Sequence, residues 1–305
     1  MDIDHARLVT RRELLAHGFD DGEIRGRKRR GELITLRRGA YAAAGALPER
    51  PEDRHAAQVR VAVRQVSPDA VVSHLSAAVL YGFPVWGDPL RRVQMTRSRR
   101  SGARVTDDLH VHAAPLDPWE LVTVDGITVT SVARTLVDVG RHVGFEQAVV
   151  VADAAMWRQV VTREELDVAL AAAHGRPGVP AARRALAFAR WGSESVGESR
   201  SRVAMLHAGI PAPILQWEVR TAGGLLLGRT DFGWPQYRTF GEFDGREKYG
   251  RLVPPGRTAG DIVYAEKRRE DAMRDEGLGA VRWGWTDLDP FTPTATRLRR
   301  TFRAA

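Results

Sequence analysis

The spacing of hydrophobic and polar residues differs between segments of the chain, and the first segment predicts a helix. LVTRRELLAH (residues 8–17) places Thr10 as an N-cap with Glu13 three residues later, which is a capping box, and Gly18 follows as the end of the helix. The nearly all-basic stretch GEIRGRKRR (22–30) predicts a second helix.

After the second predicted helix, hydrophobic and polar residues alternate. ELITLRRGAYAAAG reads as a small β wing that turns at Arg38-Gly39. Two short helices, a turn and a wing predict a winged helix-turn-helix, in which the second helix enters the DNA major groove.

The last third of the chain returns to longer elements. ESVGESRSRVAMLHAG predicts a helix that ends at Gly209, and AEKRREDAMRDEG predicts an amphipathic helix. Three strands lie between them, in ILQWEV, LLLGRTDFGW and RTFGEFDG, and a strand in GAVRWGW and a helix at 293–302 follow. This order predicts an α/β domain.

A length of 305 residues favours two or three domains. We predict a multidomain α+β and α/β chain: a winged helix-turn-helix at 1–50, a mixed α/β middle domain at 51–190 and an α/β domain at 191–305.

Composition and motifs exclude several kinds of site and location. The chain has no cysteine, so disulfides and thiolate ligands are excluded, and any metal is held by oxygen or imidazole. No apolar run is long enough to span a membrane and the N-terminus does not read as a secretory signal, which predicts a cytoplasmic protein with no membrane partner. No P-loop or GxGxxG motif occurs.

Basic charge is concentrated rather than spread. The net charge is +8, and the segment 23–38 holds seven basic residues against two acids. Compact basic blocks suit the DNA backbone, although a solvated charged face is the common alternative. The predicted DNA-binding residues are Arg11, Arg12, Arg25, Arg27, Lys28, Arg29, Arg30, Arg37 and Arg38.

Three acidic residues near one predicted hairpin give the most specific prediction of a binding site. A symmetric hairpin centred between Gln236 and Tyr237 places Asp231 opposite Glu242, and period two places Asp244 on the same face. Opposed carboxylates repel unless a cation lies between them, so this edge predicts a site for Mg²⁺ or Mn²⁺.

Three neighbouring side chains extend that site. Glu194 or Glu198 on the preceding helix is a candidate further ligand, although Glu198 could instead pair with Arg202 on the surface. Lys248 is a candidate catalytic lysine or simply a solvated one.

The middle segment contains no predicted active site. His110 and His112 are expected on one face of a strand, and His74 lies between Ser73 and Ser76, but the sequence offers no third metal ligand or serine-hydrolase motif.

Two segments resemble known families. TRRELLAHG, LRRGAYAAAG, VVSHLSAAVLYGFP and DGITVTSVARTLVDVGR resemble AbiEi-like antitoxins over about residues 5–160. This resemblance implies a DNA-binding regulator of a toxin–antitoxin operon, with a cognate toxin protein as partner and a homodimer as one oligomeric alternative.

RTDFGWPQYRTFGEFDGREKYG and EKRREDAMRDEGLGAVRWGWTDL resemble the Vsr-like branch of the PD-(D/E)XK (restriction-endonuclease-like) superfamily, over about residues 194–290. The resemblance implies that Asp231, Glu242 and Glu198 bind the metal of a DNA endonuclease. Asp244 stands where the family has its lysine, so Lys248 would have to replace it.

Two functions follow from these patterns. The first is a DNA-binding protein whose last domain hydrolyses DNA phosphodiester bonds with Mg²⁺, and the sequence does not exclude RNA as the substrate. The alternative is a non-catalytic regulator of the antitoxin type. The retained acids favour the first, and the missing family lysine favours the second.

Overall fold

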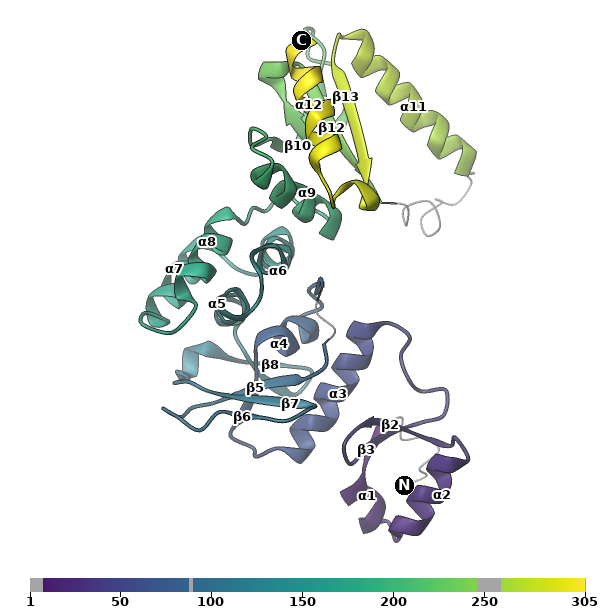
Figure 1. The fold of residues 1–305 in the computed structure, drawn as a ribbon, viewed down its shortest axis with the longest axis vertical. Coiled ribbons are helices and arrows are strands. Elements are labelled where there is room, and N and C mark those ends of the chain that lie inside the picture. The colour runs from purple at the N-terminus through teal and green to yellow at the C-terminus, as the bar shows by residue number, and fades with distance from the viewer. Residues whose placement is uncertain (1–7, 88–89, 246–258, 305) are drawn as a thin grey trace. The chain divides into compact units, whose positions relative to one another are not determined.

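The fold is known from a computed structural model, which describes residues 8–87, 90–245 and 259–304. The chain has a mixed α/β fold and divides into two compact units (Figure 1). Unit 1 comprises Met1–Ala155 with Gln159–Ala189, and unit 2 comprises Met156–Arg158 with Arg190–Ala305.

Unit 1 begins with a short strand that the sequence does not predict, followed by the two short helices and the hairpin that it does predict. Thr10 caps α1 and Glu13 closes the predicted capping box, while Asp20 and Glu23 form a second box that starts α2. Gly31 follows α2 with φ +76°, which favours glycine. The elements are β1 (Leu8–Thr10), α1 (Arg11–Ala16), α2 (Asp21–Arg29), β2 (Leu33–Arg37) and β3 (Ala40–Ala43), in the sheet order β1-β3-β2.

Helix α3 (Pro51–Gln65) links this segment to the rest of unit 1. Ala57 and Val61 pack against Leu36 and Ala40 of the hairpin. Arg37 is buried at the end of β2 and donates to Asp108 at 3.0 and 3.1 Å, so an ion pair joins the hairpin to the central sheet.

This ion pair predicts a specific response to acid. Burial by itself raises the pKa of Asp108, but Arg37, the Thr106 hydroxyl and the Arg38 amide outweigh it and hold the pKa below its ordinary value. The ionised form therefore contributes stability that is present above about pH 4 and is lost as pH falls through the folded-state pKa. We expect Asp108→Asn to be less stable near neutral pH and to lose less stability on acidification.

Urea unfolding between neutral pH and pH 3 measures this effect. Asp107→Asn, which changes the exposed neighbouring aspartate, is the matched control. An acid limb as steep in Asp108→Asn as in the wild type would contradict the prediction.

The central part of unit 1 is a six-stranded sheet and the helices around it. The sheet has the order β6-β7-β5-β4-β9-β8. Its strands are β4 (Ala70–Val72), β5 (Val93–Arg97), β6 (Arg104–Val105), β7 (Leu109–Ala113), β8 (Leu121–Val124) and β9 (Ile127–Thr130). The helices are α4 (His74–Leu80), α5 (Val132–His142), α6 (Phe145–Trp157), α7 (Arg163–Ala172) and α8 (Val179–Phe188), with the short helix η1 at Pro118–Glu120.

Helices α5 and α8 pack unusually closely. A Cβ atom at Gly140 would lie 2.9 Å from Cα of Ala182, so only glycine allows this approach. The close packing fixes the position of α5, which carries Arg134, Asp138 and His142.

Unit 2 follows the order that the sequence predicts. Its sheet runs β10-β11-β12-β13, with β12 and β13 parallel and the other pairs antiparallel. The elements are α9 (Val196–His207), β10 (Ile214–Arg220), β11 (Leu226–Trp234), β12 (Thr239–Asp244), α11 (Ala259–Asp275), β13 (Gly279–Gly284) and α12 (Thr292–Ala304), with short helices η2 (Pro235–Tyr237) and η3 (Trp285–Asp287).

Helices cover both faces of this sheet. Phe232, Trp234, Phe243 and Trp283 form a core with residues of α9 and α12, including Met205 and Leu298. Phe240 lies in a second core with Met273 of α11. Side chains two residues apart on a strand point to the same face, so Glu242 lies on the α11 face with Phe240. Phe243 points to the opposite face, into the other core, as predicted.

Within the described residues, no helix is both long and apolar enough to cross a membrane.

Candidate nucleic-acid interface and acidic site

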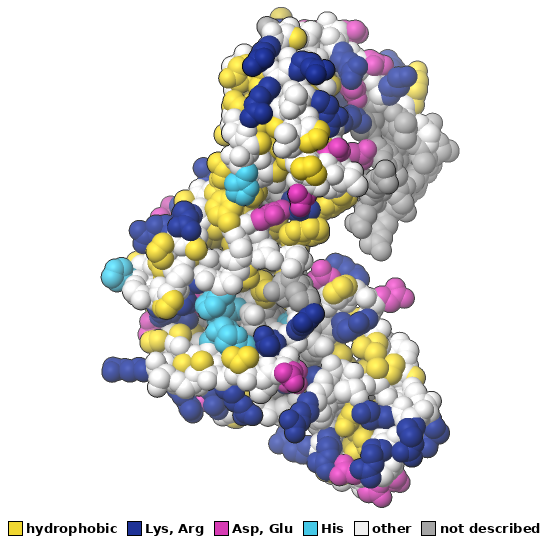
Figure 2. Space-filling model, in the orientation of Figure 1, with side chains coloured by type: hydrophobic (Ala, Val, Ile, Leu, Met, Phe, Trp, Pro, Cys, Tyr) yellow, Lys and Arg dark blue, Asp and Glu magenta, His cyan; other side chains and the backbone are white. Residues whose placement is uncertain are grey.

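The basic residues of α2 form a stripe on its exposed side. Arg25, Lys28 and Arg29 are exposed and are spaced i, i+3, i+4, while Ile24 is buried in the small core below. Lys and Arg side chains gather over this end of unit 1 (Figure 2). Arg12 on α1 and Arg38 at the hairpin turn are also exposed.

Several other predicted DNA-binding residues already contact acids. Arg11 donates to Asp21 at 2.6 and 2.8 Å, and this hydrogen bond lowers the pKa of Asp21. Arg27 and Arg30 both pair with Glu32, at 3.8 and 2.5 Å. The Arg11–Asp21 pair joins α1 to α2, so it sets the angle between the helices rather than offering a free cation.

Arg37 requires a correction. Its side chain is 7% exposed and donates both of its hydrogen bonds to Asp108. A buried, paired guanidinium is not available to a phosphate, so we remove Arg37 from the proposed DNA-binding set.

The hairpin register in unit 2 matches the predicted one. Phe232 pairs with Gly241, Gly233 with Phe240 and Trp234 with Thr239. Extending this register by one residue would place Asp231 opposite Glu242. The side chains of Asp231 and Phe232 point to opposite faces of the sheet. Because Phe232 lies in the α9 core, Asp231 lies on the α11 face with Glu242.

Both acids have partners inside the protein. Glu242 accepts from Arg269 at 2.6 Å and pairs with Arg282 at 2.7 Å. Asp231 Oδ2 accepts from the backbone N–H of Phe243 at 2.8 Å. The argument that only a bound cation makes the opposed acids tolerable is therefore wrong, because two arginines already offset the charge of Glu242.

The remaining candidates lie in different surroundings. Glu198 is buried at the start of α9, where it accepts from the Ser195 hydroxyl, the Glu194 amide and Gln216 Nε2 at 2.8–3.0 Å. Glu198 and Arg202 are both buried, so a pair between them would not be an ordinary surface ion pair. Glu194 pairs with Arg229 at 2.9 Å, and Asp244 is exposed. Lys248 lies outside the described residues.

A hard divalent ion fits this set incompletely. Among the described histidine and acidic side chains, the group of three with converging ligand atoms is a set of histidines in unit 1, not Asp231, Glu242 and Glu198. Magnesium prefers several oxygen ligands that are not already neutralised. Because Glu242 already pairs with Arg269 and Arg282, the described acids do not form a complete ligand set for magnesium.

Sequence reasoning missed the residues that hold the acids. Arg269 lies on α11 and Arg282 on β13, and Arg282 also pairs with Glu270 at 2.8 Å. One of these partners could have been found from the sequence, because Glu242 lies beside Arg282 when β12 and β13 pair in parallel. Recognising that β12 and β13 pair in parallel would have identified this ion pair.

Comparisons with known proteins assign no activity. No family model matches the chain. Two curated Mycobacterium tuberculosis proteins, uncharacterized protein MT2308 (strain CDC 1551) and uncharacterized protein Rv2248 (strain H37Rv), are each 34% identical over 163 residues. The matched region is 49% of this chain and 60% of each relative, less than two thirds of their length.

One solved structure is distantly similar. The crystal structure of the RV2827C protein from Mycobacterium tuberculosis covers 70% of this chain and 83% of its own, at 17% identity and a TM-score of 0.40. A similarity at this level assigns neither a fold nor a function.

Proposed function

We propose that this chain binds double-stranded DNA through α2 and the β2–β3 hairpin. The observation that carries the proposal is the exposed stripe of Arg25, Lys28 and Arg29 on one side of a helix that is capped and anchored to α1. Cations at i, i+3 and i+4 face one way, as a helix that follows phosphates in a groove requires.

The surroundings of α2 support this role. A capping box starts each of α1 and α2, Leu14 and Ile24 of the two helices pack in one small core, and the exposed Arg11–Asp21 pair links them. Arg38 lies at the turn of the hairpin, where a wing would meet the DNA backbone. In this proposal the chain acts as a regulator of the antitoxin type, and a toxin protein is its expected partner.

The test compares two variants that lose the same charge. Arg25→Gln/Arg29→Gln removes two cations from the stripe, and Arg183→Gln/Arg184→Gln removes two exposed cations from α8 in the same unit. We expect only the first to raise the Kd for duplex DNA at least about tenfold and to reduce the slope of log K against log salt by about 1.8.

Binding is measured by gel shift and fluorescence anisotropy, with the duplex immediately upstream of the coding sequence and a scrambled duplex of equal length. Circular dichroism verifies that both variants fold. Equal affinities and salt slopes for the two double variants would remove α2 from the interface.

Hydrolysis of DNA by unit 2 is the second candidate function. Two observations favour it: the order helix, three strands, helix, strand, and the position of Asp231 opposite Glu242 on the α11 face. Both are expected of a PD-(D/E)XK nuclease, with Mg²⁺ or Mn²⁺ as the proposed cofactor. The arginines on Glu242 and the exposed Asp244 weigh toward a domain that binds DNA without cutting it.

A further inference from the structure

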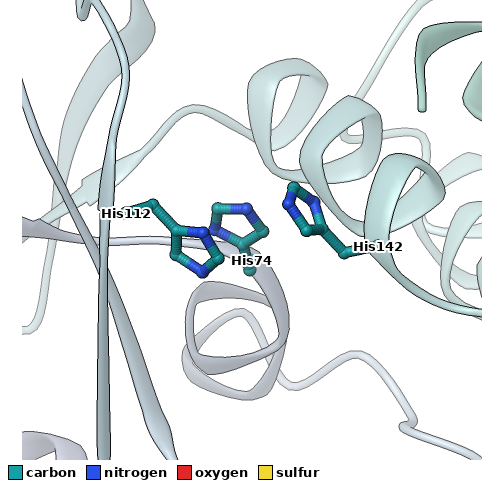
Figure 3. Close-up of side chains that lie close together, drawn as sticks. All are labelled: His74, His112 and His142. Carbon is teal, nitrogen blue, oxygen red and sulfur yellow. The ribbon is translucent and has the colours of Figure 1, made fainter. Parts of the chain in front are cut away.

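Four histidines gather in unit 1, from three elements that are distant in sequence. His74 begins α4, His110 and His112 lie on β7, and His142 ends α5. The rings of His74 and His112 stack at 3.8 Å, and that of His142 stands edge-on to them at 4.5 and 5.1 Å (Figure 3). The ligand nitrogens of His74, His112 and His142 all lie within 4.8 Å of one another.

The sequence predicts one part of this cluster. His110 and His112 share a face of β7, as their spacing of two predicts, and their rings stack 3.6 Å apart. Of these two, only His112 belongs to the set of three with converging nitrogens, and the fold brings His74 and His142 to it.

Two nitrogens of the cluster have no hydrogen-bond partner. His74 Nε2 and His112 Nε2 are both buried and unpartnered. Burial lowers the pKa of His74 well below its ordinary value and that of His112 to about 3, so both rings are neutral near pH 7. Unpartnered nitrogens of buried neutral imidazoles are costly in a folded protein unless they bind something.

Neighbouring groups orient the rings. His142 Nδ1 lies 2.8 Å from the Asp138 carbonyl oxygen, which can only accept, so Nδ1 is the donor and Nε2 is the nitrogen that could bind a metal. His74 Nδ1 lies 2.8 Å from the Ser73 hydroxyl, which in turn accepts from Thr96. Hydrogen bonds of this kind on the second ring nitrogen are typical of histidines that bind metals.

The backbone of His74 is also unusual. Its φ is +54°, in the left-handed region that a residue with a side chain rarely occupies, although it begins a helix and is buried. Such conformations cost free energy and cluster at functional sites. This backbone positions the ring against His112 and His142.

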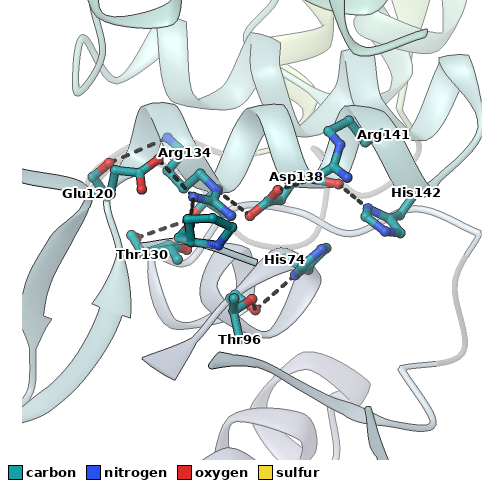
Figure 4. A network of polar contacts seen from close by, with 12 residues as sticks. His74, Thr96, Glu120, Thr130, Arg134, Asp138, Arg141 and His142 are labelled. Carbon is teal, nitrogen blue, oxygen red and sulfur yellow. Dashed lines mark hydrogen bonds and ion pairs between the residues drawn. The ribbon is translucent and has the colours of Figure 1, made fainter. Parts of the chain in front are cut away.

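Two arginines beside the cluster form ion pairs with carboxylates. Arg134 pairs with Glu120 and Asp138, and Arg141 pairs with Asp138, so two cations face two carboxylates (Figure 4). The three candidate ligands are imidazole side chains. An imidazole set favours zinc and the other late first-row transition metals over magnesium or calcium.

We propose that His74, His112 and His142 bind a divalent late first-row transition metal ion, with Zn²⁺ as the expected occupant. Three histidines leave a fourth position for water or an anion, the arrangement of an open zinc site. Zn–N bonds of about 2.1 Å hold ligand nitrogens at most about 4.2 Å apart. Binding one ion would therefore require the stacked rings of His74 and His112 to turn out of their stack and the exposed His142 to move inward, so that the three lone pairs point to the same place.

The first experiment measures binding to the full chain, purified without a polyhistidine tag and dialysed against a chelator. Calorimetric titration with Zn²⁺ is expected to give one ion per chain, Co²⁺ to give visible d–d absorption, and Mg²⁺ to give no binding. Zn²⁺ at about a hundred times its Kd is expected to raise the Tm of unit 1 by about 5–10 °C.

Variants identify the ligands. His142→Asn changes an exposed side chain and His112→Asn a half-buried one, while His174→Asn changes an exposed histidine outside the cluster. We expect the first two to weaken Zn²⁺ binding and Co²⁺ absorption more than about tenfold, since even the outer-shell partners of metal ligands contribute 10–100-fold. His174→Asn is expected to bind as the wild type does.

Two results would overturn the proposal. One is the lack of stoichiometric Zn²⁺ or Co²⁺ binding by the wild-type chain. The other is unchanged binding by His142→Asn with circular dichroism like that of the wild type. Neither result bears on DNA binding by α2.

Discussion

Replacing Arg134 by methionine is expected to lower the free energy of unfolding of unit 1 by about 3–5 kcal/mol. The Arg134 side chain is 1% exposed and lies 2.8 Å from Glu120 and 2.7 Å from Asp138, whose side chains are 1% and 0% exposed. Methionine keeps much of the length but removes the charge. Two buried carboxylates would then remain, with Arg141 as the described cation on Asp138.

Thermal and urea unfolding of the full chain measures this loss. Arg183→Met, at an exposed position of α8, is the control and is expected to change stability by less than about 0.5 kcal/mol. In a triple variant, Glu120→Gln and Asp138→Asn added to Arg134→Met should recover part of the loss, because the uncompensated charges are gone. A loss below about 1 kcal/mol in Arg134→Met would contradict a structural role for this network.

Replacing Asp231 by asparagine is expected to reduce DNA cleavage by at least about a hundredfold, if unit 2 is a nuclease. Asparagine keeps an oxygen that can accept the Phe243 N–H, so the fold is retained while the charge is lost. This variant is better than one at Glu242, because removing Glu242 also breaks the ion pairs with Arg269 and Arg282.

Nicking of supercoiled DNA with Mg²⁺ or Mn²⁺ provides the measurement. Glu218→Gln is the matched control, since Glu218 is an exposed acid on β10 of the same sheet and pairs with exposed Arg220. Cleavage by Asp231→Asn at the wild-type rate, or no cleavage by the wild type, would discard the nuclease function and leave DNA binding by α2 untouched.

Much of the secondary structure could be predicted from sequence because the signals are local. Thr10 and Glu13 lie three residues apart and cap α1 through their own side chains. The register of the β11–β12 hairpin follows from the position of its turn, which is why Asp231 and Glu242 could be placed opposite each other.

The roles of those same residues were less predictable. Arg37 pairs with Asp108, 71 residues away, and so belongs to the fold rather than to a DNA-binding surface. Glu242 pairs with Arg269, 27 residues away, which removes the electrostatic argument for a cation at the opposed acids. The charges within one segment of the sequence do not show which residues of other helices or strands will pair with them.

By itself, the sequence determined most of the helices and strands and the hairpin register, because capping, turn geometry and side-chain period act within a few residues. Only the tertiary structure decided which charges are neutralised and which histidines meet. Those outcomes depend on packing between distant elements, where burial makes an unpaired charge or an unpartnered nitrogen costly and so selects the partner.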